Sequence, residues 1–322
     1  NLEVNSKFFL KWPLIKRKLK TIFLNEGVNI VHVRSRVPAW IAIPVAKKLD
    51  LKTVSTIHSR FKTNNFFKKF YNKKMLRVDK IIAISEYIKK SIIEQYKFKE
   101  IHKKIKVIHR GVDFKIFNNS SISQYRLIQE ADRISLPDDK RVIMLPGRAT
   151  KWKGHTILIE AASKIKDEDF ILVLLGAGNG SKSFVQNLYD KCKASNLYPN
   201  FRIVSWSDDM PASLMLADVI VMPSIEPEPF GRIAVEAQAM GRPIVAFNHG
   251  GAKETIIDGD TGWLAKDLSS QELANSILKS LKMNARERKK LSDQAISHVK
   301  KNFSKEKMCD QTLEIYNKLF SD

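Results

Sequence analysis

Short apolar runs alternate with longer amphipathic stretches along almost the whole chain. The runs are rich in Ile, Val, Leu and Phe and too short for helices, so they predict buried parallel strands. The predicted strands are Asn29–Val33, Lys52–Ile57, Ile81–Ser85, Ile105–Ile108, Val142–Leu145, Phe170–Leu175, Arg202–Val204, Val219–Met222 and Pro243–Phe247. The predicted helices are Leu14–Leu24, Ala39–Leu49, Glu86–Gln95, His155–Lys164, Lys182–Ala194, Ala212–Leu216, Ile233–Met240, Ser270–Met283 and Ser304–Phe320. Such alternation predicts an α/β fold whose parallel sheets are covered by helices on both faces.

The chain has 322 residues, 43% of them hydrophobic, which is enough for two domains with cores of their own. Residues 114–140 are polar and poorly patterned, so the domain boundary is placed there. We therefore expect an N-terminal domain over 1–125 and a C-terminal domain over 126–303. A C-terminal helix over 304–322 is expected to cross back to the first domain.

The net charge of +22 is concentrated at one end of the chain. Residues 1–110 hold 27 Lys and Arg against 7 Asp and Glu, or +20, and the remainder holds 29 against 27, or +2. A field of this size attracts anionic partners. Nucleic acid, anionic lipid head groups and a phosphorylated glycolipid are the three candidates, and no helix-turn-helix, zinc-finger or RNA-binding signature supports the first.

Two segments of the basic half favour a membrane surface. Residues 11–24 predict a basic amphipathic helix with an apolar stripe of Ile15, Leu19, Ile22 and Phe23. The run Arg60 to Arg77 mixes aromatic and basic residues, which is typical of a membrane interface but equally of an exposed loop over a small apolar cluster.

The cellular compartment follows from weaker signals. Cys192 and Cys309 lie far apart without metal-ligand spacing, which fits a reducing compartment. No apolar run approaches the roughly 20 residues that span a bilayer. We expect a cytoplasmic protein that is peripheral on the inner face of the cytoplasmic membrane.

Glu228 and Glu236 are the most informative residues for chemistry. Glu228 follows the predicted strand Val219–Met222, and Glu236 lies inside the helix that comes next. Between them, Phe230 and Gly231 would place backbone N–H groups at the helix N-terminus, where a phosphate binds well. Two carboxylates beside a phosphate site can accept hydrogen bonds from sugar hydroxyls, which predicts a nucleotide-sugar site. The plain alternative is a capping residue and a solvated helix face.

Other candidates follow predicted strands in the same half. Arg148 and Lys153 come after Val142–Leu145, at the strand end where open α/β sheets bind ligands, although both could be ordinary loop cations. Gly250 and Gly251 follow Pro243–Phe247 and either let the backbone approach a ligand or only form a turn.

The basic half has candidates of its own at strand ends. Arg34 and Arg36 suit an acidic or phosphorylated acceptor, because guanidinium groups pair with both. His58 ends the strand Lys52–Ile57 and is either a site residue or a packed side chain. Ser85 either contacts the acceptor or simply caps the helix beginning at Glu86.

Several motifs in chain order resemble the retaining glycosyltransferases of family 4, which have the GT-B fold. The motifs are Ile108–Asp113, Pro146–Arg148, Lys151–His155, Glu228–Glu236, Gly250–Gly251 with Glu254, and Asp260–Trp263. A narrower likeness, carried by His32–Trp40 and Tyr71–Met75, is to the lipopolysaccharide-core mannosyl- and glucosyltransferases. The resemblance implies two Rossmann-like domains whose parallel sheets face each other across a cleft.

The resemblance also implies roles for the candidate residues. Arg148 and Lys153 would bind the donor diphosphate, Glu236 the ribose and Glu228 the sugar hydroxyls. His58 would lie beside the reacting carbon. The implied reaction moves a hexose from a nucleotide-diphospho-sugar to a lipid-linked glycan with retention, without cofactor or metal.

One departure from the family concerns the N-terminal domain. Gly27 is the only glycine in residues 1–110, whereas the family opens with a glycine-rich loop that faces the donor phosphates. We therefore expect an incomplete N-terminal domain and slow turnover. The alternative function is a non-catalytic remnant that binds nucleotide sugar, and a basic nucleic-acid-binding protein is less favoured.

Overall fold

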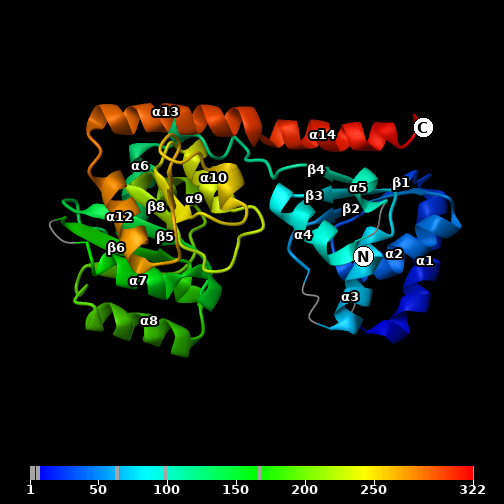
Figure 1. Cartoon of the computed structure of the whole chain (residues 1–322), viewed down its shortest axis with the longest axis horizontal. Helices are drawn as coiled ribbons and strands as arrows, with labels where there is room; N and C mark the ends of the chain where they lie inside the picture. Colours follow the sequence, from blue (N-terminus) through cyan, green and yellow to red (C-terminus); the bar gives the residue numbers. More distant parts are fainter. Residues whose placement is uncertain (1–3, 5–7, 62–64, 98–99, 166–167, 322) are drawn as a thin grey trace. The chain divides into compact units, whose positions relative to one another are not determined.

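The computed structural model describes residues 4, 8–61, 65–97, 100–165 and 168–321. The chain forms two compact units, one of residues 1–110 with 306–322 and one of residues 111–305. Each unit is built on a parallel β-sheet (Figure 1).

The first unit holds a sheet of four described strands in the order β1-β2-β3-β4. The strands are β1 (Ile30–Val33), β2 (Lys52–Ile57), β3 (Lys80–Ala83) and β4 (Ile105–Val107). The helices are α1 (Trp12–Asn25), α2 (Arg36–Lys48), α3 (Phe66–Lys73), α4 (Glu86–Tyr96), α5 (Ile101–Lys104) and nearly all of α14 (Lys305–Lys318). The carboxyl ends of these parallel strands share one edge, where ligands of open α/β sheets bind.

The C-terminal helix α14 packs on this first sheet. Ile315 and Leu319 are buried in a cluster with Val54, Ile82 and Ile108, which come from β2, β3 and the residue after β4. Burial of apolar surface thus attaches the last helix to the basic unit.

The second unit holds a six-stranded parallel sheet in the order β10-β9-β8-β5-β6-β7. Its strands are β5 (Arg141–Pro146), β6 (Phe170–Leu175), β7 (Phe201–Val204), β8 (Val219–Met222), β9 (Ile244–Phe247) and β10 (Trp263–Ala265). Its helices are α6 (Gln124–Ile134), α7 (His155–Ala162), α8 (Lys182–Ala194), α9 (Met210–Leu216), α10 (Arg232–Ala239), α11 (Ala252–Thr255), α12 (Ser270–Leu281) and α13 (Ala285–Asn302). This is the strand order of the Rossmann fold.

Alternate residues of each strand supply two cores. Ile143 and Leu145 of β5 pack with α7, α8 and α12 on one face. Val142 and Met144 of the same strand pack with α6, α9 and α10 on the other. All nine predicted strands are present, and the predicted α/β class with parallel sheets covered on both faces is confirmed.

The division between the units falls earlier than the boundary expected at residue 125. The Val112 N–H donates to the Phe303 carbonyl at 2.8 Å, and the Arg126 guanidinium forms two 2.7 Å bonds to Asp209. These bonds attach the polar linker to the second unit, so polarity alone placed the boundary too late.

Six α-helices and strands of the described structure were not predicted: α3, α5, α6, α11, α13 and β10. Helix α6 lies in the stretch interpreted as linker, and Ile134 is its one fully buried apolar residue. Helix α13 begins with a capping box between Asn284 and Glu287, but it buries only Leu291, Ala295 and Val299. Few buried apolar positions give a weak periodic signal.

No helix in the described part of the chain combines the length and the apolarity that crossing a bilayer requires.

We predict that Ile315→Ala destabilises the first unit, because Ile315 is 4% exposed and its loss leaves a cavity against the sheet. The expected cost is about 2–4 kcal/mol of unfolding free energy, measured by urea denaturation. Leu313→Ala on the same helix is the control, since Leu313 is 54% exposed and should lose little. Equal costs for the two variants would contradict the packing of α14 on the sheet.

Candidate active site

The strand order of the second sheet reverses between β5 and β8. The chain runs from β5 outward through β6 to β7, and then returns to β8 on the other side of β5. In such sheets the connections on either side of the reversal diverge, which leaves a crevice at the carboxyl edge that binds ligands. Arg148 and Lys153 follow β5, and Glu228 and Glu236 follow β8, so four of the predicted donor residues flank this position.

The connections after β5 and β8 are in close contact near the strand ends, at Gly154. This residue has a φ of 77°, and a Cβ placed on it would lie 1.8 Å from the Pro223 carbonyl oxygen. The Ile225 N–H also donates to the Trp152 carbonyl at 2.8 Å. Only glycine permits both the left-handed backbone and this approach.

An ion pair joins the two connections. The Lys153 ammonium lies 2.6 Å from Glu228 Oε1, and the Ser224 hydroxyl donates to the same oxygen at 2.6 Å. The Lys153 ammonium also lies 4.4 Å from the centre of the Trp152 ring, a cation–π contact. Glu228 is 7% exposed, so these donors balance a carboxylate that is largely removed from water.

The Gly250–Gly251 turn packs against the backbone of the loop that carries Glu228. The Gly251 N–H donates to the Glu228 carbonyl at 2.8 Å. A Cβ on Gly250 would lie 2.7 Å from that carbonyl oxygen, and one on Gly251 would lie 2.4 Å from the Phe230 Cα. The pair therefore packs against protein backbone, and an approach of this backbone to the donor stays a prediction.

Glu236 lies on α10 and is 7% exposed. Its Oε1 accepts a 2.7 Å bond from Arg232, one turn earlier on the helix, whose side chain is 72% exposed. Burial raises the pKa of Glu236, and the neighbouring Arg232 opposes that rise. A buried carboxylate whose one partner is exposed to solvent can exchange that partner for ligand hydroxyl groups.

The remaining predicted donor residues are placed as follows. Gly231, with a φ of 86°, is the N-cap residue of α10, and the helix begins at the next residue. Phe230 is 2% exposed and packs edge-to-face on Phe303, so only its backbone could meet a donor. Arg148 is exposed directly beyond β5.

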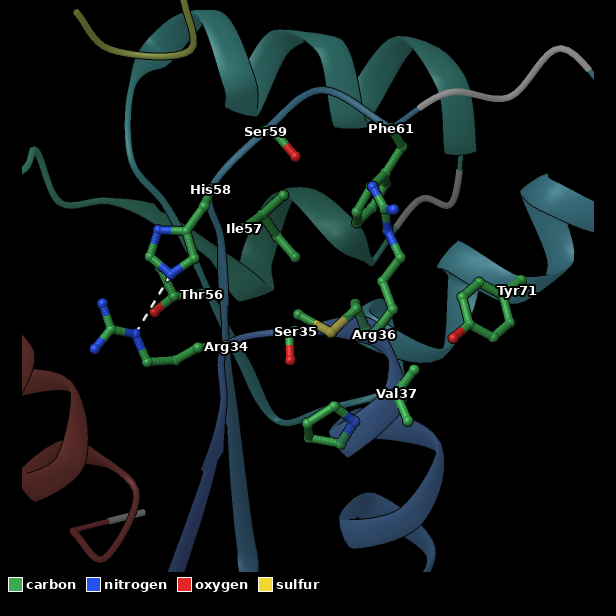
Figure 2. A pocket seen from close by; sticks show the side chains of 12 residues that line it. Arg34, Ser35, Arg36, Val37, Thr56, Ile57, His58, Ser59, Phe61 and Tyr71 are labelled. Atoms are coloured by element: carbon green, nitrogen blue, oxygen red, sulfur yellow. Dashed lines mark hydrogen bonds between the residues drawn. The ribbon is translucent and has the colours of Figure 1, made fainter. Parts of the chain in front are cut away.

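The first unit has a pocket of about 470 Å³ at the carboxyl edge of β1 and β2 (Figure 2). Arg34, Arg36 and His58 are in its lining, as are Phe61 and Tyr71. The Arg36 guanidinium lies 5.6 Å from the centre of the Phe61 ring. The structure therefore brings three of the predicted acceptor-side residues together around one cavity.

His58 is held in its neutral form. Burial, together with the charges of Arg110, Arg34 and His32, lowers the pKa of His58 to about 4. Its Nε2 accepts a 3.4 Å hydrogen bond from Arg34 Nε, which a neutral ring allows (Figure 2). The neighbouring His32 is hydrogen-bonded through both ring nitrogens. Its Nδ1 lies 2.5 Å from the Tyr316 hydroxyl, and its Nε2 lies 2.7 Å from the Thr56 hydroxyl.

Ser85 lies apart from this pocket lining and is fully buried. Its Oγ accepts from the Ile88 N–H at 3.1 Å, so it caps α4, which is the alternative role the sequence left open. An acceptor contact by Ser85 stays a prediction.

Sequence reasoning missed residues that orient the predicted ones. Ser224 and Trp152 fix Lys153 and Glu228, and the His249 ring lies 2.8 Å from the Ser224 carbonyl. Ser224 is the second residue after β8, a position that could have marked it. Within the described ranges, no three His, Cys, Asp or Glu side chains form a group that could hold a metal ion, and metal independence stays a prediction.

Comparison with known proteins defines the class. The family model "Glycosyl transferases group 1" matches residues 128–298, and "Glycosyltransferase Family 4" matches residues 3–115. A crystal structure of a glycosyltransferase from Rickettsia africae ESF-5 is 32% identical, covers 98% of this chain and 83% of that one, and superposes with a TM-score of 0.90. The fold is GT-B. The chain belongs to the group 1 glycosyl transferases and is a glycosyltransferase.

Two further relatives are more distant or partial. The Anabaena protein HepE, solved with UDP and glucose, is 21% identical, covers 94% of this chain and 81% of that one, and has a TM-score of 0.81, which shows the shared fold. A D-inositol 3-phosphate glycosyltransferase of Paenarthrobacter aurescens is 30% identical over 68% of this chain and 52% of its own length.

We predict that Gly154→Ala disrupts the junction of the two connections. The added Cβ would clash with the Pro223 carbonyl. The loss of unfolding free energy should therefore be about 2 kcal/mol or more greater than the loss caused by the left-handed backbone alone. Gly259→Ala is the matched control, because Gly259 has a φ of 81° with nothing within 4 Å of the added Cβ. Similar urea midpoints for the two variants would show that the close approach does not matter.

We predict that His58 titrates near pH 4 rather than 6.5, observed by NMR of the ring. Arg34→Met should raise the pKa of His58, since it removes one of the charges that lower it. Because the unfolded chain binds this proton at higher pH, His58 should make stability fall as pH drops from 6.5 toward 4. A pKa of His58 that stays at its ordinary value in both proteins would contradict the buried, cation-flanked environment.

Proposed function

We propose that this enzyme transfers a hexose, glucose or mannose, from a nucleotide-diphospho-sugar to a lipid-linked acidic glycan, with retention of configuration. The observation that carries the proposal is a pair of buried carboxylates, Glu228 and Glu236, at the reversal point of a Rossmann-ordered sheet, with Lys153 bound to one of them. Nucleotides bind at such reversal points.

The donor is assigned to the second unit, group by group. The diphosphate is bound by Arg148, Lys153 and the N-terminus of α10, where backbone N–H groups and the helix dipole favour anions. Glu236 accepts hydrogen bonds from the ribose, and Glu228 from the hexose. The structure of HepE with UDP and glucose supports a donor of this class.

In the proposed step, the acceptor oxygen forms a bond to the anomeric carbon while the bond from that carbon to the diphosphate breaks. The acceptor proton passes to the leaving phosphate on the same face of the sugar. Arg148 and Lys153 stabilise the negative charge that develops on the diphosphate. Glu228 Oε1 already accepts bonds from Lys153 and Ser224, which suits hydroxyl binding better than nucleophilic attack.

The acceptor is assigned to the pocket of the first unit. Arg34 and Arg36 supply guanidinium groups for a phosphate or carboxylate, and neutral His58 can accept a hydrogen bond from an acceptor hydroxyl. One relative's name specifies a phosphorylated acceptor, inositol 3-phosphate. A lipopolysaccharide core precursor at the cytoplasmic face of the membrane has the acidic groups and lipid anchor that this proposal requires.

We predict different binding defects for the two carboxylates. Glu236→Ala should weaken UDP and UDP-glucose equally, by about 1–3 kcal/mol, because both carry the ribose. Glu228→Gln should weaken UDP-glucose more than UDP, since the sugar loses a direct contact whereas the diphosphate is affected only through Lys153. Calorimetry with each ligand, repeated with GDP and GDP-mannose, measures both effects.

Glu160→Ala, on the exposed side of α7, is the control and should bind like the unmodified protein. Unchanged affinity of Glu236→Ala for all four ligands would refute the ribose assignment. Equal losses of UDP and UDP-glucose in Glu228→Gln would refute the hexose assignment.

A further inference from the structure

Helix α3 exposes three phenylalanines in the most basic part of the chain. Phe66, Phe67 and Phe70 are 77%, 81% and 50% exposed. Single exposed apolar residues are ordinary, but large rings gathered on one short helix mark an interaction surface. The helix is capped by the Asn65 side chain, which accepts from the Lys68 N–H at 2.8 Å, so it is an ordered element.

The residues just before α1 and its first turn add a second exposed apolar group. Phe9, Leu10 and Leu14 are 66%, 66% and 58% exposed. Trp40 connects the two groups, because its ring centre lies 6.4 Å from that of Trp12 and 5.7 Å from that of Phe70. We call the six exposed side chains Phe9, Leu10, Leu14, Phe66, Phe67 and Phe70 the apolar face.

Cations surround the apolar face. Lys68, Lys69 and Lys73 lie on α3 itself. A second pocket, of about 280 Å³, is lined by Lys47, Lys73, Leu76, Arg77, Glu100, Ile101 and Lys104. Its charged lining is four cations against one carboxylate, which suits the phosphate of a lipid head group.

The crowding of positive charge is visible at Lys74, the residue after α3. Burial lowers the pKa of Lys74, and the charges of Arg77, Lys16 and Lys47 lower it further. A surface whose cations repel one another gains stability from an anionic partner.

We propose that the apolar face and its flanking lysines form the membrane-docking surface of this enzyme, with an anionic bilayer as the partner. The rings enter the boundary between head groups and acyl chains, and the lysine ammonium groups stay at the lipid phosphates. This proposal rests on the lipid-linked acceptor of the proposed function and identifies where that lipid surface is met.

The ring geometry favours a bilayer over single-stranded nucleic acid. Base stacking needs flat aromatic platforms along a basic groove. Phe66 and Phe67 instead stand edge-to-face, with an interplanar angle of 77°. Lipid insertion requires only exposed apolar area, without a flat platform.

Helix α3 also links the docking surface to the acceptor pocket. Tyr71 lies on α3 beside Phe70, and its side chain lines the pocket that holds Arg34 and Arg36 (Figure 2). One helix therefore contributes to both the membrane surface and the proposed acceptor site, so a glycan anchored in the bilayer would be presented near its binding residues.

The test is co-sedimentation of the full chain with phosphatidylcholine vesicles, with and without phosphatidylglycerol. Binding should require the anionic lipid and weaken as salt rises. Phe66→Ala with Phe67→Ala should reduce binding to anionic vesicles by about tenfold or more, because alanine preserves the helix but removes the apolar area. Phe67→Trp should retain binding.

The matched control is Tyr125→Ala with Ile128→Ala on α6, which removes side chains that are 70% and 55% exposed from the second unit. Lys73→Glu with Lys104→Glu tests the head-group pocket and should abolish the preference for anionic lipid. Lys279→Glu with Lys282→Glu, the same charge change in the second unit, should bind nearly as the unmodified chain does.

The proposal is overturned if the phenylalanine pair variant and the α6 control variant bind anionic vesicles equally well. It is also overturned if the unmodified chain binds single-stranded RNA or DNA more tightly than anionic vesicles at the same ionic strength. UDP-glucose affinity is measured on every variant and should be unchanged. Loss of vesicle binding with intact donor binding supports the docking surface. Vesicle binding without any nucleotide-sugar binding in the unmodified chain would refute the proposed function and leave the docking surface standing.

Discussion

The close contact of Gly154 with the Pro223 carbonyl is the constraint on which the proposed donor site depends. It holds the connection after β5 against the connection after β8, at the point where the strand order reverses. Lys153 and Glu228 meet because their backbones are held this way, and the Ser224 hydroxyl completes the environment of the buried carboxylate. The two groups proposed to bind the diphosphate and the sugar are therefore held in place without a ligand, and such preorganisation lowers the entropic cost of binding.

The two units differ in how far their positive charges are balanced by carboxylates. In the second unit, cations and carboxylates pair with each other, as Lys153 does with Glu228 and Arg126 with Asp209. The first unit carries an excess of cations that its few carboxylates cannot neutralise. Burial beside such cations lowers the pKa values of His58 and Lys74 from their ordinary values. The contrast between a nearly neutral second unit and a cationic first unit is consistent with the proposed acidic acceptor and anionic surface.

Sequence patterns predicted the sheets well, since buried parallel strands are continuous apolar runs that need no tertiary information. They predicted α3 and α6 poorly, because Phe66 and Phe67 face outward and Gln124–Ile134 buries few apolar residues. The motif around Glu228 correctly placed Glu228 after a strand and Glu236 in the next helix, but it did not show that Lys153 binds Glu228 or that Phe230 is buried against Phe303. Such pairings depend on how distant connections pack, which local spacing does not encode. Ser85 shows the same limit, because capping and substrate binding favour the same residue type at a strand end.

The central claim is that a nucleotide-diphospho-hexose binds at the carboxyl edge of the second sheet. Hydrogen–deuterium exchange of the full chain, with and without saturating UDP-glucose or GDP-mannose, tests it most directly. The account predicts slower exchange in the connections 147–154 and 224–232, with no change in the turn 257–262. Slower exchange confined to other segments, or none in those two connections while calorimetry shows saturation, would contradict it.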